Sequence, residues 1–337
     1  MPTPAWEESN DSRDPHVYFR KLTPYPDILL YAMGATNTVL SGSRASAYRY
    51  ENACSWDSDW DFYCSGGHRS VAKFTHTLSF IGVSWLAPTG AGNVMYGTAF
   101  HVLNGELESY EGRPRHHKIQ VIWATPKMTA FEFITGFHST LPQCFVSAFC
   151  AVSLYHTLSS QGKFVQWVVD ETLGSMRHVN APGCVQKYQE RGYQLISCQS
   201  HETRCHDEMF QALVRCGVER PQVSQVSRAV SDSGCLVVDF TEYYEFASLS
   251  EKEIFLQSLN FIKGLRWTEK DGRCIADSAS NALQRNDLLA RIRMHYEQPL
   301  LPRCSWLMDV DDDELPWMGT AAGAGLTVDD PRMQSPV

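Results

Sequence analysis

The sequence predicts an α+β protein: a mixed β-sheet with helices, followed by a mainly helical second domain. Three observations predict this class. Short β-prone runs alternate with a segment of helical period over residues 27–130, a pattern typical of a sheet packed against helices. An apolar run of helical length follows at 141–159. An amphipathic pattern over 251–263 indicates a further helix.

The first domain is expected over residues 27–130, after a polar lead at 1–26. Its strands are indicated by β-branched and aromatic residues, and its helices by apolar residues spaced three and four apart. The expected elements, in chain order, are a helix over 28–33, strands over 36–41 and 59–64, a helix over 70–80, a strand over 83–86, a hairpin over 98–109 and a strand over 118–124. The hairpin is indicated by Asn104-Gly105, a pair that favours a tight turn.

The second domain is expected over residues 131–300 and is expected to be mainly helical. Residues 141–159 (LPQCFVSAFCAVSLYHTLS) are apolar nearly all round, which is typical of a buried helix, and Pro142 suits its first turn. The other elements expected there are helices over 185–192, 206–216 and 251–263 and strands over 193–198 and 233–240. The acidic and then Gly/Ala-rich stretch over 309–337 predicts a disordered tail.

Composition narrows the class of protein. The chain has 337 residues, of which 43% are hydrophobic and 20% charged, as in an ordinary globular protein. Its net charge of -9 does not favour a broad electrostatic grip on nucleic acid. The 11 cysteines include no C-x-x-C pair, which favours buried thiols in a reducing compartment. Without a secretion-signal pattern or a membrane-spanning run, we expect a cytoplasmic or nuclear protein.

Two carboxylates are the strongest candidates for chemistry. Asp59 and Asp61 are two apart on a predicted strand, so both project from one face, while Trp60 and Phe62 project from the other. A pair of carboxylates on a rigid strand suits Mg²⁺ or Mn²⁺. Such an ion neutralises triphosphate charge and activates an attacking oxygen. We therefore take Asp59 and Asp61 as candidate metal ligands and catalytic residues.

A phosphate-binding turn is expected just before these carboxylates. Gly42 allows the backbone to approach a phosphate closely, and Ser43 can donate a hydrogen bond to it. A short helix over 44–47 would direct its free N–H groups at the same phosphate. Arg44 could add a bidentate contact. These three residues are the candidate nucleotide-binding residues of the first domain.

The combination of these motifs resembles the DNA polymerase beta-type nucleotidyltransferase superfamily. The shared pattern is a hydrophobic strand, Gly42-Ser43, a spacer over 44–58 and then Asp-hydrophobic-Asp-hydrophobic, and it covers residues 28–124. The resemblance implies a nucleoside triphosphate substrate, bound with Mg²⁺ or Mn²⁺. It also implies a basic residue of the helical domain on the triphosphate, for which Lys187 is the candidate.

A second resemblance covers most of the chain. Blocks such as SGSRAS (41–46), DSDWDFY (57–63) and KYQERGYQL (187–195) are similar to recurring blocks in a group of uncharacterised fungal proteins. This resemblance implies a shared fold and no particular reaction.

One position departs from the superfamily pattern. Active members add a third carboxylate from a later strand, and the equivalent position holds Gln120. A neutral amide binds Mg²⁺ more weakly than a carboxylate and is a poor general base. Three interpretations stay open: another carboxylate (Glu106, Glu108 or Asp57) substitutes, two carboxylates suffice, or the protein binds a nucleotide without transferring it.

Two further histidine-containing groups are weaker candidates. His116-His117 lie in the basic run 113–118, whose plainest interpretation is a loop before a strand and whose alternative is a rim that binds phosphate or the acceptor. His201, Cys205 and His206 have a helical spacing that could hold zinc, although they offer three ligands at most.

The expected function is that of a nucleotide-binding, Mg²⁺-dependent nucleotidyltransferase-like protein. Its partners would be a nucleoside triphosphate and a small-molecule or protein acceptor, because the acidic charge disfavours long nucleic acid. The alternatives are a catalytically inactive binding or scaffold protein with the same fold, and an interaction module whose exposed aromatic residues contact a partner. The sequence contains neither a P-loop motif nor a Gly-x-Ser-x-Gly elbow, which disfavours P-loop enzymes and α/β-hydrolases.

Overall fold

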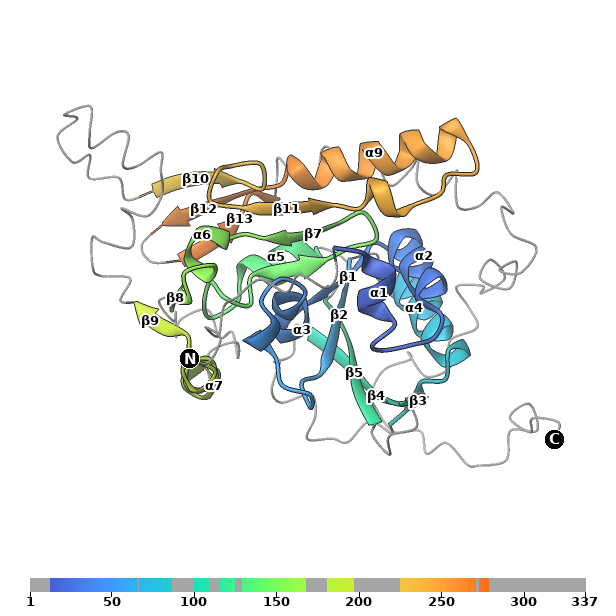
Figure 1. Ribbon diagram of the computed structural model, residues 1–337, viewed down its shortest axis with the longest axis horizontal. Helices are drawn as coiled ribbons and strands as arrows, with labels where there is room; N and C mark the ends of the chain where they lie inside the picture. Colours follow the sequence, from blue (N-terminus) through green and yellow to red (C-terminus); the bar gives the residue numbers. More distant parts are fainter. Residues whose placement is uncertain are drawn as a thin grey trace.

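A computed structural model describes the protein over residues 13–65, 67–86, 100–109, 116–124, 129–167, 181–196, 225–270 and 273–278. The helices are α1 (Pro15–Phe19), α2 (Pro26–Thr36), α3 (Gly42–Ala47), α4 (Gly67–Phe80), α5 (Ala130–Thr135), α6 (His156–Ser159), α7 (Ala181–Glu190) and α9 (Leu249–Lys263). The strands are β1 (Thr38–Ser41), β2 (Trp60–Cys64), β3 (Ser84–Trp85), β4 (Phe100–Glu108), β5 (His116–Ala124), β6 (Cys144–Val146), β7 (Cys150–Ser153), β8 (Lys163–Val165), β9 (Gln194–Ile196), β10 (Gln225–Ala229), β11 (Leu236–Asp239), β12 (Arg266–Lys270) and β13 (Arg273–Ala276). The expectation of an α+β protein with a mixed sheet and helices is confirmed (Figure 1).

An eight-stranded sheet organises the described residues. Its strand order is β11-β7-β6-β1-β2-β5-β4-β3. Strand β2 runs antiparallel to β1 and parallel to β5. The end of β1 and the starts of β2 and β5 therefore lie at the same end of the sheet, where Ser41 pairs with Asp61 and Asp61 with Gln120. This arrangement brings segments far apart in sequence to one place.

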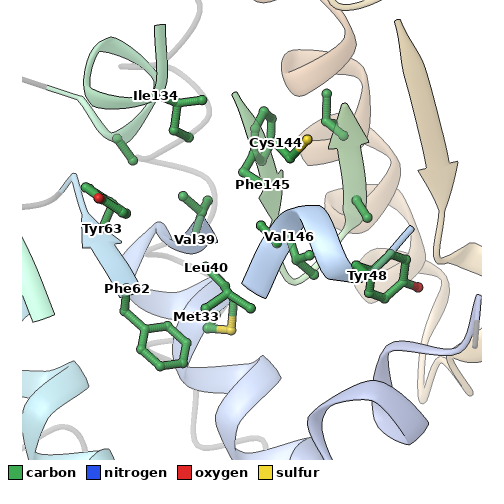
Figure 2. Close-up of a cluster of buried hydrophobic side chains, with 14 of the residues drawn as sticks. Met33, Val39, Leu40, Tyr48, Phe62, Tyr63, Ile134, Cys144, Phe145 and Val146 are labelled. Carbon is green, nitrogen blue, oxygen red and sulfur yellow. The ribbon is translucent and has the colours of Figure 1, made fainter. Parts of the chain in front are cut away.

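Successive side chains of β2 alternate between the two faces of the sheet, as the sequence predicts. Trp60 and Phe62 are buried on one face, where the Phe62 ring centroid lies 5.2 Å from that of Phe74 in α4. Tyr63 points to the other face, where its ring centroid lies 5.4 Å from that of Phe133 in α5. Figure 2 shows this division, with Phe62 and Tyr63 on opposite sides of β2. Asp61 lies on the Tyr63 face because side chains two apart on a strand share a face.

The buried helix expected over 141–159 is wrong. This segment contains β6, a turn, β7 and then the short helix α6. Strands β6 and β7 pair with each other in the interior of the main sheet and every residue in both is buried. A strand covered on both faces needs no alternation of polar and apolar residues, so its sequence is as uniformly apolar as that of a buried helix.

The hairpin expected over 98–109 is also wrong. Phe100–Glu108 forms the continuous strand β4, which pairs with β5 along its whole length. Gly105 serves close packing rather than a turn, because a β-carbon there would lie 2.7 Å from Val83 and 2.8 Å from the Trp85 ring. A glycine inside a strand often marks such a close approach.

The other expected elements differ in outcome. Helices α2, α4, α7 and α9 and strands β1, β2, β3, β5, β9 and β11 confirm predicted elements in type and approximate position. A mainly helical domain over 131–300 is not confirmed, because β6, β7 and β11 join the main sheet and β8, β9, β10, β12 and β13 form two smaller sheets. The helix expected over 206–216 and the tail over 309–337 lie outside the described residues. Among the helices described, none has the length and apolar character to cross a membrane.

Candidate functional site

The candidate site begins where the Asp61 carboxylate meets the turn after β1. Gly42 has φ of +72° and opens α3, directly after Ser41 of β1. A β-carbon on Gly42 would lie 3.0 Å from Oδ2 of Asp61, so the carboxylate lies against the backbone of the turn. The short helix expected after Gly42-Ser43 is present as α3. The turn and the Asp61 carboxylate thus lie together.

The carboxylates sit in an environment that disfavours two negative charges. Oδ1 of Asp61 is buried and has no hydrogen-bond partner among the described residues. Burial, and then the charge of Asp59, raise the pKa of Asp61 to about 7. Burial also raises the pKa of the half-buried Asp59, against the opposing effect of Lys118. A buried carboxylate oxygen without a partner costs stability, and a cation placed there would relieve that cost.

These two carboxylates fit a divalent cation. Asp59 lies just before β2 and Asp61 is its second residue. They offer carboxylate oxygens, the ligand type that Mg²⁺ prefers. Burial raises the pKa values of both groups, and a bound divalent cation would supply a counter-charge and a partner for Oδ1 of Asp61.

Helix α7 brings the predicted basic residue to the same place. Lys187 lowers the pKa of both Asp59 and Asp61, so its ammonium group lies within electrostatic reach of the pair. The next residue, Tyr188, has its hydroxyl 3.3 Å from the hydroxyl of Ser43. The contact fixes α7 against the start of α3. Gly42 therefore lies against Asp61, Asp59 and Lys187 lie within electrostatic reach of Asp61, and Ser43 contacts the residue next to Lys187.

Arg44 makes contacts that the sequence did not indicate. Its Nε donates to the carbonyl oxygen of Ser58 at 3.0 Å, and its Nη2 donates to that of Trp56 at 2.8 Å. Its guanidinium group also lies 4.9 Å from the centroid of the Trp60 ring. Arg44 thus holds the loop that precedes β2. Its expected contact with phosphate stays a prediction, and it would compete with these interactions.

The position of the third carboxylate is filled by an amide pair. Gln120 is opposite Asp61 in the strand register, and its Nε2 donates to Oδ1 of Asn104 at 3.1 Å. Across the described part of the chain, no group of three or more His, Cys, Asp and Glu side chains could hold a metal.

The acids proposed as substitutes have other neighbours. Glu106 pairs in register with Lys118, and Glu108 with His116. Asp57 is exposed, and a hydrogen bond from Ser55 is the main cause that lowers its pKa. These contacts do not decide between the three interpretations, each of which stays a prediction.

Two further residues lie near the site: sequence analysis gave Lys118 only as the end of the basic run 113–118, and it missed Trp56. Lys118 is two residues before Gln120 on β5, so it shares the face of Gln120, and its charge lowers the pKa of Asp59. Strand alternation alone would have identified it. Trp56, in the loop before Asp59, is 68% exposed. Its exposure could not be read from the sequence, because large aromatic residues are usually buried.

The weaker histidine candidates have different outcomes. His116 and His117 belong to β5 rather than to a loop, and the His117 ring lies 6.3 Å from the Trp60 ring, centroid to centroid. His201, Cys205 and His206 lie outside the described residues.

Comparison of the chain with protein-family models, with curated proteins and with solved structures found no significant match.

Proposed function

We propose that this chain is a nucleotide-binding, Mg²⁺-dependent nucleotidyltransferase-like protein. It would transfer the nucleotidyl group of a nucleoside triphosphate to a small-molecule or protein acceptor. One observation carries the proposal: a buried oxygen of Asp61, without a hydrogen-bond partner in the described chain, belongs to a carboxylate that lies against the Gly42 turn. A metal-bound triphosphate needs carboxylates to bind the metal and backbone N–H groups to bind the phosphates, and this arrangement would supply both.

The roles follow from the chemistry of each side chain. Asp59 and Asp61 would hold Mg²⁺ or Mn²⁺, which supplies the positive charge that phosphoryl and nucleotidyl transfer require. The backbone of Gly42 and the hydroxyl of Ser43 would bind the triphosphate, and Lys187 would neutralise part of its charge. Tyr188 positions Ser43 through the contact between their hydroxyl groups. Fixed groups of this kind lower the barrier mainly by orientation and electrostatics.

A catalytically inactive nucleotide-binding protein is the second candidate. The observation that favours it is the hydrogen bond between Gln120 and Asn104 at the third-carboxylate position. An amide engaged in this way has no charge to offer a second cation and accepts no proton from an acceptor hydroxyl. Binding would then serve recognition or scaffolding.

A thermal-shift experiment tests the metal and nucleotide site that both candidates share. The four nucleoside triphosphates with Mg²⁺ or Mn²⁺ are expected to raise the Tm of the wild type, since a ligand that binds only the native state stabilises it. The variant Asp59→Ala/Asp61→Ala is expected to lose this shift, and Glu253→Ala, which removes an exposed acid on α9, is expected to keep it. Equal shifts in all three proteins, or none in the wild type, would remove the proposed site. Pyrophosphate release in the presence of candidate acceptors then separates the enzyme from the binding protein.

A further inference from the structure

Trp56 is a large aromatic residue at the surface beside the candidate site. It is 68% exposed, whereas Trp60 and Trp267 are 1% and 0% exposed. It lies three residues before Asp59, a distance along the chain of at most about 11 Å. Exposure of one aromatic side chain is ordinary by itself, so it is the position of Trp56 near the predicted metal ligand Asp59 that points to a role in the site.

The loop that carries Trp56 is held from two directions. Arg44 of α3 donates to the carbonyl oxygens of Trp56 and Ser58. Arg191, directly after α7, donates to the carbonyl oxygen of Ala53 and, at 2.8 Å, to the hydroxyl of Ser55. The two guanidinium groups come from α3, which supplies Ser43, and from the residue directly after α7, which supplies Lys187. The exposure of the indole is therefore a property of a fixed loop, coupled to the predicted triphosphate residues.

We propose that Trp56 is the platform on which the base of the bound nucleotide stacks. The inference rests on the proposed function, because it assigns the part of that site which takes the base. A flat indole provides a large contact area at a low cost in conformational entropy, and each of the nucleobases has an aromatic face that can stack on it. Recognition of this kind tolerates all four bases and favours the larger purines.

The Trp56 side chain can be replaced without removing the hydrogen bonds that hold its loop. Arg44 binds the backbone carbonyl of Trp56, and Arg191 binds other residues of the loop. The variant Trp56→Ala keeps these backbone and serine acceptors and removes the ring. The variant Trp56→Phe restores an aromatic face. Phe80, 57% exposed on α4, provides the matched control Phe80→Ala for loss of an exposed aromatic ring elsewhere.

Calorimetric titration with ATP, CTP and inorganic tripolyphosphate, each with Mg²⁺, tests the proposal. Trp56→Ala is expected to bind ATP about tenfold more weakly than the wild type and to bind tripolyphosphate equally well. Trp56→Phe should recover most of the ATP affinity, CTP should lose less than ATP, and Phe80→Ala should match the wild type.

The possible failures are distinguishable. Equal ATP affinity in wild type and Trp56→Ala would overturn the stacking role and leave the proposed function standing. An equal loss for ATP and tripolyphosphate would overturn it too, because the ring would then act on the phosphate site or on the loop itself. A wild type that binds neither ligand would remove both proposals.

Discussion

The backbone of Gly42 lies against the carboxylate of Asp61, with 3.0 Å between Oδ2 and the place where a β-carbon would stand. The glycine is required twice, once by its φ of +72° and once by this close approach. The contact joins the end of β1 to the start of β2 and sets the distance between the predicted phosphate turn and the predicted metal ligands.

Replacing Gly42 by alanine is therefore expected to destabilise the protein by about 1–2 kcal/mol from the backbone conformation alone, and by more because of the crowded carboxylate. Urea unfolding gives the free energy of unfolding. The control is Gly162→Ala, where φ is +69°. If both substitutions cost the same, and Gly42→Ala costs no less in an Asp61→Ala background, the carboxylate contact contributes nothing.

The raised pKa of Asp61 predicts a pH dependence of stability without metal. Burial raises the pKa of Asp61 from about 3.8, its ordinary value, to about 7 in the folded protein. Between these values the native state keeps a proton that the unfolded chain has released. The free energy of unfolding should therefore fall as pH rises from about 4 to 7, by at most about 4 kcal/mol.

The comparison that isolates this group is wild type against Asp61→Asn, in EDTA, by urea unfolding at several pH values. The difference in free energy of unfolding between the two proteins should change across pH 4 to 7 and stay constant outside that window. Added Mg²⁺ should restore wild-type stability near pH 8, because it favours the ionised carboxylate. Parallel curves across the whole range would show that Asp61 titrates normally.

Much of the candidate site could be predicted from local sequence. The alternation of Asp61 with Trp60 and Phe62 depends on strand geometry alone, and the structure bears it out. Position 42 favours glycine because the local backbone has a positive φ there. The presence of Lys187 at the site has no local signal, and the resemblance to a superfamily was what suggested it.

Other features escaped prediction because distant contacts determine them. Residues 144–146 and 150–153 form strands rather than parts of one helix because β1 and β11 flank them, and no pattern within the segment records those neighbours. Gly105 sits in a strand because Val83 and Trp85 pack over it, which overrides the turn preference of Asn-Gly. The loop at Trp56 is held by Arg191, which is far away in sequence.

Lys187 offers a test of the predicted triphosphate contact. Lys187→Ala is expected to weaken tripolyphosphate binding roughly tenfold, because a cation near the phosphates is lost. It should also raise the pKa of Asp61, since Lys187 now lowers it. Titration calorimetry measures the affinity, and the exposed Lys252→Ala on α9 controls for loss of one positive charge. Should the two lysine variants bind tripolyphosphate alike, Lys187 would have no part in the site.

The residue at position 120 is predicted to limit the number of cations that the proposed site could hold. It is opposite Asp61 in the parallel register, so Gln120→Asp places a third carboxylate on the same face of the sheet. Mn²⁺ affinity, measured by electron paramagnetic resonance of free ion, is expected to rise roughly tenfold, because each added carboxylate oxygen suits a hard divalent cation. Gln120→Ala also breaks the hydrogen bond to Asn104 and adds no charge, so it is the matched control. A gain in Gln120→Asp alone would support Asp59 and Asp61 as the metal ligands. Unchanged Mn²⁺ binding in both variants would place the metal elsewhere, and the face of β2 would then lose its assignment.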